Sequence, residues 1–203
     1  MKPILFNTEM VRTILEDRKT VTRRVIKPQP TYSPNDGFTW KGAAYGTDLP
    51  PTIKGAGYYL SRCVAPYEIN DILYVRETWI PKESEENGKL VKGFAYKADF
   101  TGYESMFAWR PSIHMPKEAA RIFLRVTDVR VERLHDMKLI DYLAEGISNP
   151  CDTCKRFPFD ECDTCGREGT IGLRFAALWD STIKADHEHY CYTANPFVWV
   201  IEF

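Results

Sequence analysis

The spacing of hydrophobic residues predicts a short helix near the start of the chain. In "NTEMVRTILEDRK" Met10, Val11 and Ile14 recur at helical spacing on one face, and Thr8 stands where an N-cap residue belongs. The following stretch "TVTRRVI", residues 20–26, contains β-branched residues that favour an extended backbone. The pattern therefore predicts a helix followed directly by a strand.

Five further segments have a clear pattern. Apolar and polar residues alternate over residues 69–80 and 120–134, and the chain closes with the apolar stretch 196–203, so we expect three strands there. Residues 136–146 and 173–183 have apolar residues at helical spacing. For the first of these two helices, Asp136 is the expected N-cap and Gly146 suits the C-terminal end.

Two long stretches, residues 28–62 and 81–116, follow no period. The first mixes proline, glycine and aromatic residues, and the second contains one short strand-like segment, "GFAYKA". We interpret both as loop-like insertions. The order helix, three strands, two helices, strand is not the alternation of a doubly wound sheet. We therefore expect a single α+β domain over residues 1–203, a small mixed barrel with helices packed at its ends.

Composition and charge narrow the class of protein. Hydrophobic residues make up 44% and aromatic residues 13% of the 203-residue chain, which argues against disorder. The formal net charge is -1, so binding to nucleic acid needs a local basic surface. No apolar run has membrane-spanning length, and "MKPILFNTEM" becomes polar too soon for a signal peptide. We expect a cytoplasmic protein.

The cysteines give the strongest local signal. Two C-x-x-C pairs, seven residues apart, lie in "CDTCKRFPFDECDTCG" within residues 150–167. Four thiolates complete a tetrahedral zinc site and leave no position for water, so the metal is expected to be structural. The alternative is a reduced loop without metal. The predicted ligands are Cys151, Cys154, Cys162 and Cys165.

The basic stretch "LEDRKTVTRR" raises the question of chemistry. The chain has no glycine-rich phosphate loop, no G-x-S-x-G and no H-E-x-x-H. However, "LEDRKTVTRR", "INDILYVRETW", "LAEGI" and "NPFVWVIEF" together resemble the ASCH domain family. The likeness is greatest to a subgroup common in bacteriophage and prophage genomes, which also carries "WRPSIHMP" and the cysteine pairs. The chain departs from the family at Asp17 and Asn70, where glycine is usual.

The resemblance implies a PUA-like β-barrel with a pocket at one end for RNA, nucleosides or related ligands. Small bacterial relatives in that superfamily hydrolyse the amide of N4-acetylcytidine with a lysine, a threonine and a glutamate. By motif these roles fall on Lys19, Thr22 and Glu145, and Arg24 takes the place of the motif arginine.

The implied chemistry is reasonable for these residue types. A desolvated lysine beside other cations has a lowered pKa and can take the proton of the Thr22 hydroxyl, which then attacks the acyl carbon. Glu145 can protonate the departing amine, and Arg24 or a backbone N–H can hold the oxyanion. Lys19 and Thr22 point to opposite faces of a regular strand, so a turn or bulge has to intervene. We expect Lys19 within hydrogen-bond reach of Thr22 or Glu145.

The other charged residues near these motifs have less specific expectations. We expect Arg23 and Lys27 on a solvated strand edge, where charge discourages strand addition. Glu77 is a ligand-binding candidate, with burial beside Arg24 as a structural pair as the alternative.

The stretch "FAWRPSIHMP" in the second insertion supplies Trp109, Arg110 and His114. Aromatic stacking, positive charge and a proton-handling group suit a nucleobase, so these three are ligand-binding candidates. The alternative is that Trp109 and Met115 fill the end of the barrel.

Three functions stay open from the sequence. The first is binding of a nucleobase, modified nucleoside or RNA at Lys19, Thr22, Arg24 and Glu145, with hydrolysis of an N4-acylated cytidine as a further step. The second is a non-catalytic RNA-binding module whose basic residues grip phosphate. The third is a phage accessory protein that acts through a protein partner.

The cysteine spacing makes a direct prediction about metal. Protein purified without chelator is expected to carry about one zinc ion per chain by elemental analysis. Replacing Cys151 and Cys154 by serine removes two of four ligands and should release the ion while most of the domain stays folded. A native protein free of metal, or a disulfide among these cysteines under reducing conditions, would contradict the zinc site.

Overall fold

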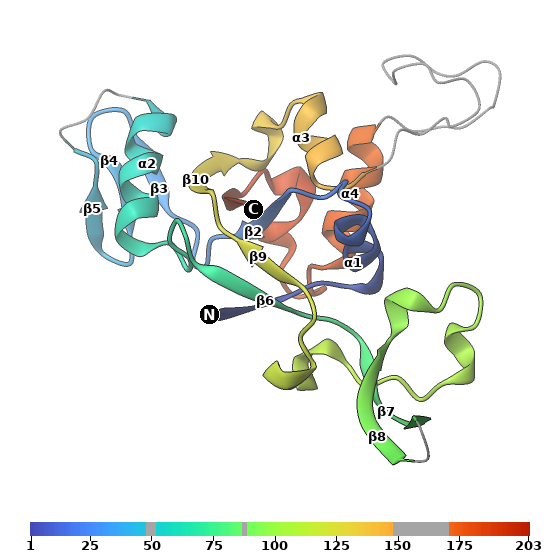
Figure 1. The fold of residues 1–203 in the computed structure, drawn as a ribbon. Helices are drawn as coiled ribbons and strands as arrows, with labels where there is room; N and C mark the ends of the chain where they lie inside the picture. Colours follow the sequence, from blue (N-terminus) through green and yellow to red (C-terminus); the bar gives the residue numbers. More distant parts are fainter. Residues whose placement is uncertain (48–51, 87–88, 148–170) are drawn as a thin grey trace, which may run out of the picture. The chain divides into compact units, whose positions relative to one another are not determined.

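The structure is a computed structural model that describes residues 1–47, 52–86, 89–147 and 171–203. The chain divides into two compact units, and each unit is made of two segments. Residues 1–18 and 69–126 form the first unit, and residues 19–68 and 127–203 form the second. Helices and strands mix in both, which confirms an α+β protein (Figure 1). In the described part of the chain, no helix has the length and apolar character needed to cross a membrane.

The first unit contains a three-stranded sheet, a long hairpin and one α-helix. Strand β6 is central in the sheet, with β1 parallel on one side and β9 antiparallel on the other. Its elements are β1 (Lys2–Leu5), α1 (Thr8–Leu15), β6 (Ile72–Arg76), β7 (Trp79–Glu86), β8 (Lys89–Tyr96) and β9 (Phe123–Arg125), with 3-10 helices at Lys97–Asp99, Glu104–Met106, Ser112–His114 and Lys117–Ala119.

The ends of helix α1 explain the turn that leads toward the basic stretch. Asn7 is the N-cap, one residue before the expected Thr8, and its side-chain oxygen accepts from the Met10 amide at 2.8 Å. After the helix, Asp17 adopts a left-handed backbone with φ of 54°. Asn70, the other position where the family that the sequence resembles usually has glycine, has φ of 72°. Asp and Asn tolerate this conformation better than most residues, so both positions keep a turn that glycine usually makes.

In its described residues the second unit contains a three-stranded antiparallel sheet, a small meander and three α-helices. Strand β11 is central between β10 and β2, and the meander runs β3, β4, β5. Its elements are β2 (Val21–Val25), β3 (Thr31–Ser33), β4 (Gly37–Trp40), β5 (Ala43–Tyr45), α2 (Ile53–Val64), β10 (Asp128–Arg133), α3 (Leu139–Ala144), α4 (Ile171–Ser181) and β11 (Phe197–Glu202), with 3-10 helices at Leu134–Asp136, Glu188–Tyr190 and Tyr192–Ala194.

The two faces of the sheet β10–β11–β2 carry different packing. On one face Val198 and Val200 of β11 belong to an apolar cluster with Phe175 and Trp179 of α4. On the other face Phe197 packs edge-on against Phe38 of the meander, with ring centroids 5.0 Å apart. Burial of both faces explains why β11 reads as a continuous apolar run in the sequence.

The expected loop-like insertion over residues 28–62 is largely regular structure, so that prediction is wrong. It contains the β3–β5 meander and helix α2. Helix α2 carries Gly55 and Gly57, which lower its intrinsic helix propensity. For this reason the sequence pattern does not indicate a helix there. Gly57 has a packing reason, because a Cβ there would lie 3.1 Å from the Val131 Cβ of β10. Close approach of α2 to the sheet therefore outweighs the local preference.

The strand expected over residues 120–134 is two strands in two different sheets. Strand β9 pairs with β6 in the first unit, and β10 pairs with β11 in the second. The helix expected over 136–146 is shorter, because a 3-10 helix occupies Leu134–Asp136 and α3 begins only at Leu139. The second insertion is also more regular than expected, since β7 and β8 pair over eight residue positions.

The ladders of the described residues form four separate sheets, and none of them closes on itself. The expected closed barrel is therefore not seen in this part of the chain.

Candidate functional site

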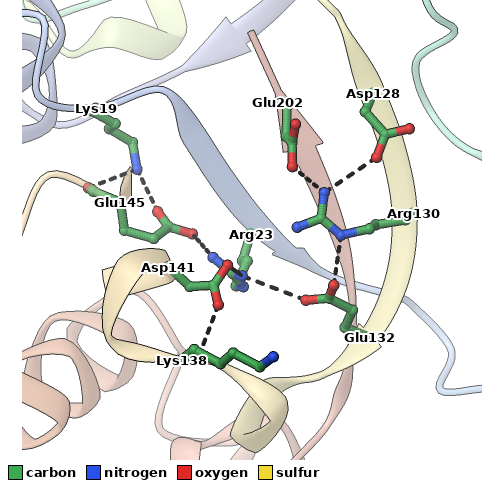
Figure 2. Close-up of polar contacts among 9 residues, drawn as sticks. All are labelled: Lys19, Arg23, Asp128, Arg130, Glu132, Lys138, Asp141, Glu145 and Glu202. Carbon is green, nitrogen blue, oxygen red and sulfur yellow. Dashed lines mark hydrogen bonds and ion pairs between the residues drawn. The ribbon is translucent and has the colours of Figure 1, made fainter. Parts of the chain in front are cut away.

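Lys19, the residue expected to act as the base, is buried. Only 2% of the residue is exposed, and it lies just before β2, in an isolated β-bridge with Glu145. Its ammonium group donates to the Glu145 carboxylate and, at 3.0 Å, to the Glu145 carbonyl oxygen (Figure 2). The expected hydrogen bond from Lys19 to Thr22 or Glu145 is thus formed with Glu145.

The end of helix α3 brings Glu145 to this position. Gly146 has φ of 87° and donates to Leu143 at 2.9 Å, while Ile147 donates to Tyr142 at 3.1 Å. This is the Schellman arrangement, which ends the helix and satisfies the carbonyl groups of Tyr142 and Leu143, so that those of Ala144 and Glu145 need other partners. Lys19 provides such a partner for the Glu145 carbonyl, and a cation is favoured at a helix C-terminus.

Backbone hydrogen bonds fix the same junction. The Thr20 amide donates to the Ala144 carbonyl at 2.9 Å, and the Phe203 amide donates to the Thr20 carbonyl at 3.0 Å. The start of β2 is therefore tied both to the end of α3 and to the end of β11. The position of the Lys19–Glu145 pair follows from backbone pairing as well as from charge.

Arg23 joins the pair, which corrects the expectation that this residue lies on a solvated edge. Its side chain has no exposed surface. It reaches Glu145 at 3.3 Å, Asp141 at 3.0 Å and Glu132 at 3.5 Å. The other oxygen of Asp141 accepts from the Lys138 amide at 2.8 Å, so helix α3 holds Asp141 in place (Figure 2). By contrast, Lys27 is exposed as expected.

The ion-pair network continues from Glu132 to the edge strand β10. Arg130 donates to Glu132 at 2.6 Å, to Asp128 at 3.2 Å and to Glu202 of β11 (Figure 2). The connected group contains three cations, Lys19, Arg23 and Arg130, and five carboxylates, Asp128, Glu132, Asp141, Glu145 and Glu202. We call these eight residues the charged network. Its excess of carboxylates makes it negative overall.

Thr22 and Arg24 lie on the other face of β2. Thr22 is opposite Ile201 and Arg24 opposite Trp199, while Arg23 is opposite Val200. Because side chains alternate along a strand, Thr22 and Arg24 leave β2 on the face opposite Arg23, although the charge of Arg24 still acts on Lys19 and Glu145. Thr22 is buried and Arg24 is half-buried. Lys19 lies before β2 and not within it, so strand alternation does not by itself separate Lys19 from Thr22.

Burial controls the protonation of Lys19. Desolvation lowers the pKa of Lys19 below its ordinary value, and the attraction and hydrogen bond of Glu145 offset part of that lowering. The positive charges of Arg24 and Arg23 lower this pKa further. A lysine in these surroundings releases its proton more readily than one in water, which is a requirement for a lysine general base.

Glu77 belongs to the first unit, and its partner is not Arg24, the one considered as the alternative to ligand binding. It is 1% exposed, and both its oxygens accept from the Arg121 guanidinium, at 2.9 and 3.0 Å. Desolvation raises the pKa of Glu77, while the hydrogen bonds and charge of Arg121 oppose the rise. Arg121 also pairs with Asp99 at 2.8 Å, so the interactions of Glu77 are those of a structural ion pair.

The three candidates in "FAWRPSIHMP" also belong to the first unit. Trp109 packs with Phe100 and Phe107, its ring centroid 5.4 Å from each of theirs. Arg110 pairs through its backbone with Trp79 and lies with its guanidinium 5.4 Å from the centre of that ring. His114 is exposed. These residues do not share the unit that contains Lys19 and Glu145.

The four cysteines of the expected zinc site lie outside the described residues. Within residues 1–47, 52–86, 89–147 and 171–203, no group of three or more His, Cys, Asp or Glu side chains is arranged to hold a metal ion. A comparison of the chain with protein-family models, curated proteins and solved structures finds no match.

The burial of Arg23 leads to a test of stability. Replacing Arg23 by methionine leaves three carboxylates without their shared cation, and we expect the free energy of unfolding to fall by about 3 kcal/mol. The matched variant Lys27→Met removes an exposed cation from just beyond the same strand and should cost about 1 kcal/mol or less. Urea unfolding of both variants and of the wild type measures the difference. Equal losses in the two variants would contradict the network.

Proposed function

We propose that the chain is an ASCH-type domain that binds a nucleobase or modified nucleoside at the Lys19–Glu145 pair. The observation that carries the proposal is the direct contact of these two residues, which lie 126 positions apart in the sequence. They are two of the three residues to which the family resemblance assigns chemical roles. The PUA-like relationship, and a structural zinc ion on Cys151, Cys154, Cys162 and Cys165, are parts of the same proposal.

The chemistry of the pair supports recognition of a polar heterocycle. The carboxylate of Glu145 can accept from an exocyclic amine, and the ammonium group of Lys19 can donate to a ring carbonyl. The Nε–H of Arg23 is buried and has no hydrogen-bond partner among the described residues, so it is a further donor in the same surroundings. Donors and acceptors in a desolvated site discriminate strongly between ligands, because a mismatched ligand leaves them unpaired.

Hydrolysis of an N4-acyl amide is the second candidate function, and the lowered pKa of Lys19 favours it. In the form implied by the family, Lys19 takes the proton of an attacking hydroxyl group, the acyl C–N bond breaks, and Glu145 returns a proton to the departing nitrogen. Thr22, on the face of β2 opposite Arg23, is the nucleophile that the resemblance implies. Water as the nucleophile needs only Lys19 and Glu145, and yields the free acid and the amine directly.

A non-catalytic RNA-binding module and a phage accessory protein with a protein partner remain alternatives. The excess of carboxylates around Arg23 and Arg130 disfavours a phosphate grip at the charged network. This is why the proposal places a neutral base, rather than the phosphate backbone, at the pair.

Calorimetric titration with cytidine, N4-acetylcytidine and a short single-stranded RNA tests the proposal. We expect nucleoside binding that is nearly the same at low and high salt, since a neutral ligand releases no counterions. The Lys19→Met variant, confirmed as folded by circular dichroism, should lose that binding, and the Lys27→Met variant should keep it. Release of cytidine from N4-acetylcytidine, followed by chromatography, separates hydrolysis from binding alone.

Binding of RNA alone, weakening steeply with salt, would replace the proposal with the RNA-binding module. Absence of binding to every ligand at both salt concentrations would leave the protein-partner function in first place. Nucleoside binding that survives Lys19→Met would show that the ligand is held elsewhere.

A further inference from the structure

A cleft of about 750 Å³ lies in the second unit between the first turns of helix α2 and strand β10. Its volume is in the range of small-molecule sites. The lining residues come from α2 and its N-cap, from β10, and from the 3-10 helix that follows β10. They are Thr52, Ile53, Lys54, Gly55, Tyr58, Asp128, Arg130, Val131, Glu132 and Asp136.

The cleft has an apolar part that can hold a flat ligand body. Ile53 and Val131 contribute aliphatic surface, and Tyr58 presents an aromatic ring with 55% of the residue exposed. The Arg62 guanidinium lies 4.8 Å from the centre of the Tyr58 ring. An aromatic ring supported in this way is a stacking surface for a planar group.

The charged residues of the lining determine which sign of charge a ligand can carry. Arg130 is shared by Asp128, Glu132 and Glu202, so one guanidinium faces three carboxylates. Glu202 lies outside the lining, to which Asp136 adds an exposed carboxylate and Lys54 the second cation. The lining therefore carries three carboxylates and two cations, a net charge of -1, which favours a cation over a phosphate or carboxylate ligand.

We propose that this cleft binds a small organic cation, a protonated amine or a guanidinium carried on a planar apolar body. The body would lie against Tyr58, Ile53 and Val131, and the cation would lie near Asp136 and the outer oxygens of the carboxylates around Arg130. This site is separate from the proposed nucleoside site at Lys19, and the two proposals can be tested independently. It nevertheless touches the charged network, because Glu132 contacts both Arg130 and Arg23.

Three probes with one indole body and different charges test the sign of the cleft: tryptamine, tryptophol and indole-3-acetate. Calorimetry with the full chain at low salt should detect tryptamine, with tryptophol at least about tenfold weaker and indole-3-acetate undetectable. Tryptamine affinity should fall with added salt, since the cleft is open and its charges are screened. Equal binding of the three probes, or no binding of tryptamine, would overturn the proposal.

Variants locate the site. Asp136→Asn removes one exposed charge and should weaken tryptamine about threefold, and Tyr58→Ala removes the stacking surface with a similar or larger loss. The matched control Asp36→Asn neutralises an exposed aspartate outside the cleft and should leave the affinity unchanged. Tryptamine binding that responds equally to Asp36→Asn and Asp136→Asn would show a nonspecific effect of net charge and overturn the assignment.

Discussion

The structure of the second unit depends on one interaction with a high desolvation cost, the burial of Lys19 and Arg23 against Glu145. Moving a charge out of water costs several kcal/mol per ion, and only good geometry and further hydrogen bonds offset that cost. Here the geometry is provided by the backbone, since β2 is tied to the ends of α3 and β11 just beside the pair. An apolar pair of similar volume would often be at least as stable in such a position. The presence of charges where an apolar pair would suffice is therefore the physical ground for proposing that they have a function.

The charged network extends from buried residues at Lys19 to partly exposed residues at Arg130. Around Lys19, desolvation lowers the pKa of the lysine and strengthens each contact with Glu145. At the partly exposed end, Arg130, Asp128 and Glu132 line the cleft beside helix α2. Glu132 joins the two ends, because it contacts both Arg130 and Arg23.

The sequence predicted the elements whose signals are local. Helix α1, strand β2 and strand β11 lie where the periodicity placed them, and the Lys19–Glu145 contact follows from a family resemblance rather than from any local pattern. Helix α2 was missed because its glycines serve packing against Val131 and oppose helix propensity. The break between β9 and β10 was missed because alternation continues through it, while the pairing partners differ.

Arg23 was misassigned because its partners are distant in the sequence, the nearest being Glu132, 109 positions away. Two signals could have indicated its place. Residues 19, 21 and 23 share one side of an extended chain, so Arg23 follows Lys19 to the same face. Asp141 and Glu145 are four residues apart on one helix and present two carboxylates together. Neither signal says that the two faces meet, since that depends on the pairing of β2 with β11.

The buried state of Lys19 is tested most directly by the pH dependence of stability. Lys19 has a lowered pKa in the folded protein and an ordinary one, about 10.4, in the unfolded chain. Between these two values the unfolded chain binds more protons, so the stability that depends on Lys19 rises with pH. The free energy of unfolding of the wild type, relative to Lys19→Met at each pH, should therefore increase through this window and level off above it. A difference that stays constant with pH, or that decreases, would contradict burial of Lys19 beside Glu145 as the centre of the site.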